Sequence, residues 1–259
     1  MSTSLQLTSV HLRVADLKSS LRFYTQQIGF SLLSENAGDS TLAAYPGGPP
    51  LLRLTEDRTA VAAAPDTAGL FHAALLFPSR AALGGWLRKA ADAGVKFDGF
   101  SDHGVSEAIY LTDPEGNGLE FYSDHPRTAW PFQNGSLAMG TAPLDVADLL
   151  AAGAGHSSPA LNDATWGHLH LRVSNPDRSA DYYVHELGLS LMQRFGPNAR
   201  FLAADGYHHH LGLNNWGGIR QPQPRASLGL IEATFAKKGE PAERVLVDPD
   251  HLSLRVTPL

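Results

Sequence analysis

Three side chains that could take part in acid–base or metal chemistry lie within one short segment, residues 102–122. His103, Tyr110 and Glu120 follow one another there, and a turn-forming sequence separates the tyrosine from the glutamate. Glu120 lies inside a strand-like run of apolar residues. A carboxylate in such surroundings is costly to bury alone, so it is usually paired, hydrogen-bonded or bound to a metal. The segment therefore predicts that Glu120 has partners from elsewhere in the chain.

Two histidines outside this segment are candidates for those partners. His72 and His168 each lie at the start of a strand-like run, at equivalent positions of a repeated pattern. Two imidazoles and one carboxylate form the facial ligand set typical of non-haem Fe(II), which leaves positions open for substrate and dioxygen. The chain has 12 histidines and no cysteine, so a metal site must use His, Asp or Glu. We predict a metal site formed by His72, Glu120 and His168.

A repeated βαβββ pattern is expected to position these residues. The sequence HLRV occurs at residues 11–14 and again at 170–173, and each copy is followed by an amphipathic helix pattern, a glycine and a further strand. A weaker copy begins near residue 70 and a shortened one near residue 228. Self-similarity of this kind indicates one structural unit used several times. In chain order we call these copies units one to four.

Residues alternate in character within the predicted strands, which indicates sheets with one apolar and one polar face. If helices cover the apolar faces, the polar faces line a concave surface. The sequence therefore predicts an α+β fold in which tandem βαβββ units form two half-closed barrels, with the fourth unit shortened. We expect the first pair of units at residues 4–126, a linker rich in Gly, Ala, Ser and Pro at 127–162, and the second pair at 163–259.

The segment around Glu120 closely resembles the signature of the extradiol ring-cleaving dioxygenases. These enzymes belong to the vicinal oxygen chelate superfamily, together with glyoxalase I and the bleomycin-resistance proteins. The resemblance is carried by His103, Ile109-Tyr110, Asp113-Pro114-Glu115-Gly116-Asn117 and Glu120. Ser101 departs from the residue type that the family prefers. The βαβββ resemblance covers nearly the whole chain, and the layout looks most like that of bacterial catechol 2,3-dioxygenases.

This resemblance implies an enzyme that inserts dioxygen into a catechol-type aromatic beside its hydroxyls. The implied metal is Fe(II), with Mn(II) as an alternative, and the implied partners are a small aromatic substrate and dioxygen. It also implies that His103 and Tyr110 hydrogen-bond the substrate or oxygen and orient the ligands.

An acid–base histidine is implied as well, and residues 207–213, with the sequence YHHHLGL, are its best source. The family pattern of a histidine, one residue and then Leu-Gly-Leu selects His209. Strand alternation argues otherwise, because it places His209 on the same face as Leu211 and Leu213. We keep His209 because of the motif.

The second histidine ligand has a competing candidate. His11, His72 and Glu120 all lie in the first half of the chain, with spacings that also resemble the family. When the HLRV copies are superposed, however, His11 matches His170, and Ser9 is opposite His168. We favour His168 and leave His11 open. Unit four has Ser253 where Glu120 would fall, so no second carboxylate is expected there.

Composition excludes several functional classes and leaves others open. A formal net charge of −6 argues against nucleic acid as the main partner, and the chain has no apolar run long enough for a membrane span. We expect a cytoplasmic protein, with a homo-oligomer as an open alternative. On the same scaffold, a glyoxalase-like isomerase, a thiol transferase or a non-catalytic binding protein would be alternatives to the dioxygenase.

Overall fold

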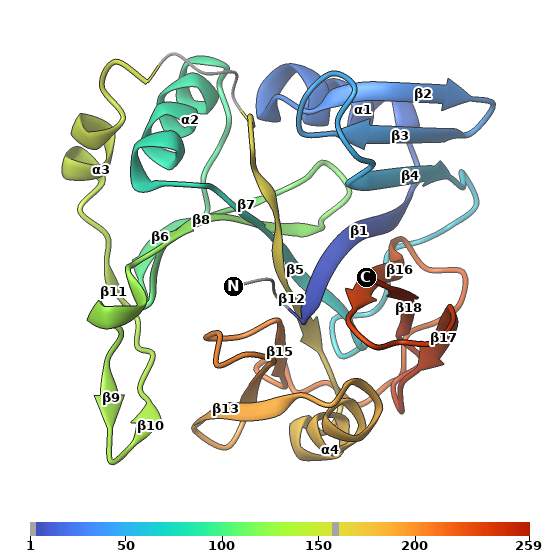
Figure 1. The fold of residues 1–259 in the computed structure, drawn as a ribbon. Coiled ribbons are helices and arrows are strands. Elements are labelled where there is room, and N and C mark those ends of the chain that lie inside the picture. Colours follow the sequence, from blue (N-terminus) through green and yellow to red (C-terminus); the bar gives the residue numbers. More distant parts are fainter. Residues whose placement is uncertain (1–3, 157–160) are drawn as a thin grey trace.

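Two large curved sheets form the framework of the protein, in a computed structural model that describes residues 4–156 and 161–259 (Figure 1). The outer sheet has seven strands in the order β17-β18-β16-β1-β4-β3-β2. Its strands are β1 Leu5–Val14, β2 Ser31–Asn36, β3 Asp39–Ala43, β4 Leu52–Glu56, β16 Gly229–Lys237, β17 Arg244–Val247 and β18 Ser253–Pro258.

The inner sheet has nine strands in the order β11-β6-β7-β8-β5-β12-β15-β14-β13. Its strands are β5 Gly69–Leu76, β6 Gly99–Asp102, β7 Ser106–Thr112, β8 Gly118–Asp124, β11 Ala142–Pro143, β12 Thr165–Arg172, β13 Ser190–Phe195, β14 Ala199–Ala203 and β15 Leu211–Asn214. A short hairpin, β9 Phe132–Gln133 and β10 Ser136–Leu137, lies beside it. The prediction of an α+β fold built from tandem βαβββ units is confirmed.

Each sheet joins one unit from each half of the chain. In the inner sheet, β5 of unit two pairs antiparallel with β12 of unit three. In the outer sheet, β1 of unit one pairs antiparallel with β16 of unit four. Figure 1 shows β5 and β12 crossing the middle of the molecule together. Side chains from units two and three can therefore meet on one concave surface, as the preferred site requires.

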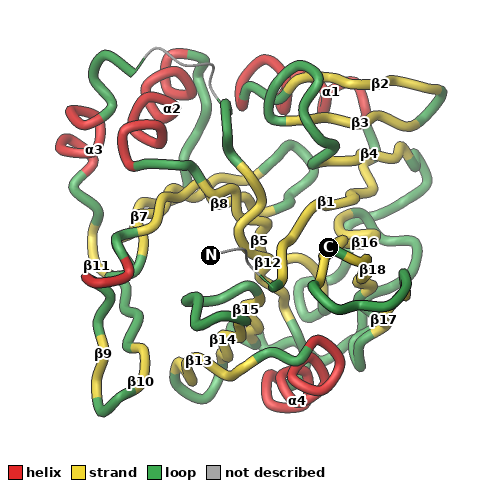
Figure 2. Tube along the Cα trace, in the orientation of Figure 1, coloured by secondary structure: helices red, strands yellow, loops and turns green. Residues whose placement is uncertain are grey.

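Helices cover the apolar faces of the sheets, as Figure 2 shows by element type. They are α1 Leu17–Arg22, continued by a π-helical turn Phe23–Ile28, α2 Arg80–Asp92, α3 Val146–Ala152, α4 Pro176–Leu187 and a short 3-10 turn Arg127–Ala129. Trp86 of α2 stacks on Phe121 of β8 with ring centroids 4.1 Å apart. Gly29 and Gly188 end their helices in the left-handed conformation that the sequence predicted.

The predicted linker is itself structured in the part that the model describes. Its strand β11 pairs with β6 at the edge of the inner sheet. Gln193 of β13, at the opposite edge, exchanges two hydrogen bonds with the backbone of Met139. The linker thus bridges the two edges of the inner sheet, and the boundaries at residues 127 and 162 remain predictions.

Two equivalent contacts tie together the units within each half of the chain. The Tyr24 hydroxyl in unit one donates to Asp113 of unit two over 2.8 Å. The Tyr183 hydroxyl in unit three donates to Asp248 of unit four over 3.0 Å. Both aspartates precede a proline in a turn, so the repeat extends to these contacts. Within residues 4–156 and 161–259, no helix has both the length and the apolar character that a membrane span requires.

Candidate metal centre and adjoining cavity

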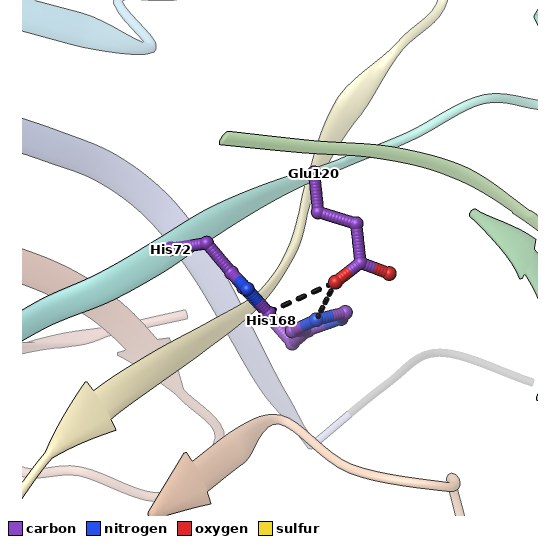
Figure 3. A group of neighbouring side chains, drawn as sticks. All are labelled: His72, Glu120 and His168. Atoms are coloured by element: carbon purple, nitrogen blue, oxygen red, sulfur yellow. Dashed lines mark hydrogen bonds and ion pairs between the residues drawn. The ribbon is translucent and has the colours of Figure 1, made fainter. Parts of the chain in front are cut away.

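The structure brings His72, Glu120 and His168 together from three strands of the inner sheet (Figure 3). His72 Nε2 lies 2.9 Å from Glu120 Oε2, and His168 Nε2 lies 3.2 Å from the same oxygen. One possible ligand atom from each residue lies within 4.8 Å of the others. All three side chains are buried. Two imidazole nitrogens and a carboxylate therefore converge on one point.

This arrangement fits a bound cation. Ligand atoms about 2.1 Å from a metal and at right angles to each other lie about 3 Å apart, which is close to the two nitrogen–oxygen distances found here. His72 Nε2 is buried and near the carboxylate, yet it has no partner in hydrogen-bond geometry among the described residues. A buried polar atom without such a partner calls for an explanation, and a metal ion provides one.

The protonation states of His168 and Glu120 are those of metal ligands. Burial lowers the pKa of His168 to about 4, although Glu120 opposes the shift, so the imidazole is neutral at pH 7. Burial opposes ionisation of Glu120, but the adjacent His168 and His72 hold the pKa of its carboxyl well below the usual range. Neutral imidazoles and an ionised carboxylate are the forms that bind metals. A cation between them would balance the buried negative charge.

A bulge in each of two strands immediately precedes a candidate histidine ligand. The β5–β12 register shifts at Phe71, before His72, and again at Gly167, before His168. A bulge re-aims the next side chain and is frequent beside functional sites. At Gly167 only glycine fits, because a Cβ there would lie 1.8 Å from the Tyr122 hydroxyl. The sequence predicted the two histidines but not the bulges that orient them.

The structure places the two candidates for the second histidine in different sheets. His11 lies on β1 of the outer sheet, where its Nε2 hydrogen-bonds Thr55 Oγ1 over 2.8 Å. His168, and not His11, lies beside His72 and Glu120. Ser253 of unit four also lies in the outer sheet, away from this group. His72 and Glu120 of unit two thus lie beside His168 of unit three, as predicted.

His103 and Tyr110 form a hydrogen-bonded pair at the side of this group. His103 Nδ1 lies 2.7 Å from the carbonyl oxygen of Gly140, so this nitrogen carries the proton and donates it. The other ring nitrogen, Nε2, then accepts from the Tyr110 hydroxyl over 2.7 Å. Burial, together with Glu120, raises the pKa of Tyr110 well above its usual value, so the hydroxyl stays protonated. The linker residue Gly140 thus orients the pair.

Comparisons with known proteins show the family to which the chain belongs. Residues 6–121 match the Glyoxalase/Bleomycin resistance protein/Dioxygenase superfamily. A protein named catechol-2,3-dioxygenase from Bacillus subtilis (strain 168) is 36% identical over 239 residues, which cover 86% of this chain and 83% of that protein. The chain belongs to this superfamily.

Solved structures related to the superfamily share the fold at low identity. A Bacillus subtilis protein matches with a TM-score of 0.63 and 11% identity, over all of this chain and 86% of that one. Glyoxalase I from Zea mays matches with a TM-score of 0.57 and 16% identity, over 98% and 92% of the two chains. These structures support the fold of the superfamily member described here.

A cavity of about 450 Å³ is lined by two of the three candidate ligands, His72 and Glu120, and by most of the other expected groups. His103, Tyr110 and His209 all line it. Strand alternation misplaced His209 because β15 begins only at Leu211, so residues 207–210 do not follow strand geometry. The motif located the residue correctly in the cavity wall, and its acid–base role remains a prediction.

Several cavity residues were not predicted. The Nε2 of His170 is buried and has no hydrogen-bond partner among the described residues. Trp216 lines the cavity and contacts the rings of Phe71 and His170. Loops place the tryptophan, so the sequence carried no signal for it. His170 could have been predicted, because it lies two residues after His168 on the same strand and so faces the same side of the sheet.

Proposed function

We propose that the protein is an extradiol ring-cleaving dioxygenase that inserts dioxygen into a catechol-type aromatic beside its hydroxyls. The observation that carries the proposal is the buried group of His72, Glu120 and His168 at the wall of an aromatic-lined cavity. Two histidines and one carboxylate with open positions are the ligand set of non-haem Fe(II) oxygenases. The similarity to a protein named catechol-2,3-dioxygenase supports the same activity.

The residues around the cavity have separate roles in this proposal. Fe(II), or Mn(II) as the alternative, would be held by the three ligands, where it would lower the pKa of a bound hydroxyl and act as a template that conducts electrons from the substrate to dioxygen. His209 is the acid–base group, because a neutral imidazole can take and return a proton near neutral pH. The hydrogen-bonded pair of His103 and Tyr110 orients the substrate and oxygen within reach of the ligands. Aromatic side chains exclude water from the rest of the cavity.

The position equivalent to Glu120 in unit three distinguishes this proposal from glyoxalase-like chemistry. The strand registers pair Ala73 with Leu119 in unit two and Leu169 with Leu211 in unit three. Glu120 therefore corresponds to Gly212, which offers no carboxylate. Glyoxalase-like sites generally use a second carboxylate, and the inner sheet has none at this position. The set of three ligands favours the dioxygenase.

The proposal predicts that Glu120→Ala abolishes both iron binding and ring cleavage while the fold is retained. Removal of one ligand from a facial set leaves too few donors to hold the metal. Iron would be measured by elemental analysis after anaerobic loading, and cleavage by the yellow product and oxygen uptake with catechol. Circular dichroism would check that the variant is folded.

Two histidine variants serve as a matched test of the ligand set. His168→Ala should lose iron as Glu120→Ala does, whereas His11→Ala should keep both iron and activity, because His11 lies in the outer sheet. Full activity in Glu120→Ala would refute the assignment. Binding of Ni or Zn without catechol-dependent oxygen uptake in the unaltered protein would favour a different reaction on the same scaffold.

A further inference from the structure

A chain of hydrogen bonds runs away from the cavity behind His209. His209 Nδ1 lies 2.7 Å from His208 Nδ1. His208 Nε2 lies 2.9 Å from Asp124 Oδ1. The side chain of His208 is fully buried, and both of its ring nitrogens are used in these two contacts. The proposed reaction does not itself require His208 or Asp124.

The order of donors and acceptors in this chain follows from the carboxylate at its end. An ionised Asp124 can only accept, so His208 Nε2 must carry a proton. In a neutral imidazole the other nitrogen is then an acceptor, so His208 Nδ1 receives a hydrogen bond. With both imidazoles neutral, His209 Nδ1 is the donor, and its Nε2 is left without a proton. Each tautomer in the chain is fixed by the partner before it.

The position of His209 is constrained on its other sides by ring contacts. Its ring centroid lies 4.1 Å from that of His168 and 4.9 Å from that of Phe201. The ring is thus held by packing, and its hydrogen-bonding partner decides which nitrogen carries the proton.

We propose that His208 and Asp124 are positioning residues that hold His209 as the Nδ1–H tautomer and so present its unprotonated Nε2 to the cavity. The benefit to catalysis rests on the proposed function, in which His209 takes a proton from the substrate. The tautomer itself does not depend on that function. A base in the wrong tautomer cannot accept a proton at the correct atom, which is why carboxylates that fix a histidine tautomer matter in other enzymes.

Asp124 is itself held in place from a second direction. The Tyr207 hydroxyl donates to Asp124 Oδ1 over 3.2 Å and lies 2.8 Å from the Tyr122 hydroxyl. Asp124 also lines a separate cleft of about 220 Å³ with Ser79 and Thr165. The carboxylate thus lies between this cleft and the imidazole of His208.

Two substitutions at one position provide the test on the iron-loaded enzyme. In His208→Asn the side-chain oxygen can still accept from His209, whereas His208→Leu leaves no acceptor. We expect kcat with catechol to fall about 100-fold in His208→Leu, which is within the range for loss of acid–base catalysis. KM and iron content should change less than twofold, and His208→Asn should recover most of kcat. A merely structural role predicts that both variants lose activity in proportion to their stability.

Tyr182→Phe is the matched control, because it removes a tyrosine hydrogen bond to the carbonyl oxygen of Val247, outside the chain from Asp124 to His209. It should retain kcat within about threefold, far less than the effect expected for loss of an acid–base group. If His208→Leu keeps full kcat with full iron content, the positioning role is overturned.

A second measurement needs no activity. In metal-free protein with 15N-labelled histidine, the ring signals of His209 can be assigned by comparison with His209→Asn. We expect a proton on Nδ1 and none on Nε2 in the unaltered protein, and a changed tautomer in His208→Leu. A proton on Nε2 in the unaltered protein would overturn the proposal, whether or not the enzyme cleaves catechols. Failure of ring cleavage with the expected tautomer would count against the proposed function alone.

Discussion

At the scale of single residues, Gly212 explains why the site has three candidate ligands and an unpaired histidine. Gly212 occupies the position in unit three that Glu120 occupies in unit two. A Cβ at Gly212 would lie 2.8 Å from the ring of His170. The imidazole of His170 thus fills the space beside the glycine. Unit three therefore has a glycine where unit two has a carboxylate, and the space beside this glycine holds the cavity-lining His170.

We expect Gly212→Ala to destabilise the protein by about 1–3 kcal/mol, because the added methyl overpacks the site against His170. The cost should be much smaller in a His170→Ala background, where the colliding ring is absent. A double-mutant cycle by urea unfolding would measure this coupling. Gly217→Ala is the control, since its new Cβ would make only ordinary contacts, the nearest at 3.5 Å. Equal costs in both backgrounds would contradict the explanation.

At the scale of elements, the linker contributes to the site through the packing of α3 on α2. A Cβ at Gly84 of α2 would lie 2.2 Å from the carbonyl oxygen of Leu149, and one at Gly153 would lie 2.3 Å from the backbone of Gly84. The two helices therefore touch backbone to backbone, as their neighbouring positions in Figure 1 suggest. This contact anchors the segment that also carries Gly140, the partner of His103.

We predict that Gly84→Ala loosens the linker and lowers kcat/KM. Glycine to alanine within a helix ordinarily stabilises by up to about 1 kcal/mol, so a loss of stability would identify the steric conflict with α3. Limited proteolysis should show faster cleavage within residues 127–156, and catechol assays should show the change in kcat/KM. Ala91→Ser, at an exposed position of the same helix, should change neither.

The sequence predicted the repeated units because their strand and helix patterns are local. It predicted His72, Glu120 and His168 because equivalent strand positions repeat, and these residues do meet. It left His11 open because local patterns do not say which units share a sheet. It missed the short strands of the linker, since loop-like composition is compatible with strands that pair only with distant edges. It also missed the chain from His209 to Asp124, which depends on contacts between residues far apart in sequence.

At the scale of the whole molecule, two kinds of contact hold the four units together. The sheets join units across the two halves of the chain, whereas buried tyrosine–aspartate hydrogen bonds join units within each half. Asp113 also accepts hydrogen bonds from the backbone and side chain of Asn117. The turn at residues 113–117 therefore forms part of the contact between units one and two.

Tyr24→Phe should destabilise the protein by about 1–3 kcal/mol, because it removes a partner of a buried carboxyl. Burial raises the pKa of Asp113, while the hydrogen bonds from Asn117 and Tyr24 act against the shift. The Tyr24 bond thus favours the charged form, so the cost should be largest at neutral pH and should decrease as the pH falls below the pKa of Asp113. Urea unfolding at several pH values would measure this. Tyr183→Phe should behave similarly, and a cost independent of pH in both variants would contradict this account.

Unit one pairs with unit four, and unit two pairs with unit three. This pairing affects the order in which the sheets can form during synthesis. All strands of the inner sheet lie before residue 215, so the candidate metal centre can assemble before the last unit leaves the ribosome. The strand β1 is made before the other described strands, yet its antiparallel neighbour β16 begins only at Gly229. Until then β1 has one unpaired edge, which is the kind of edge that recruits other chains. The earliest strand to emerge is thus among the last to be completed, and aggregation of nascent chains should concentrate at that edge.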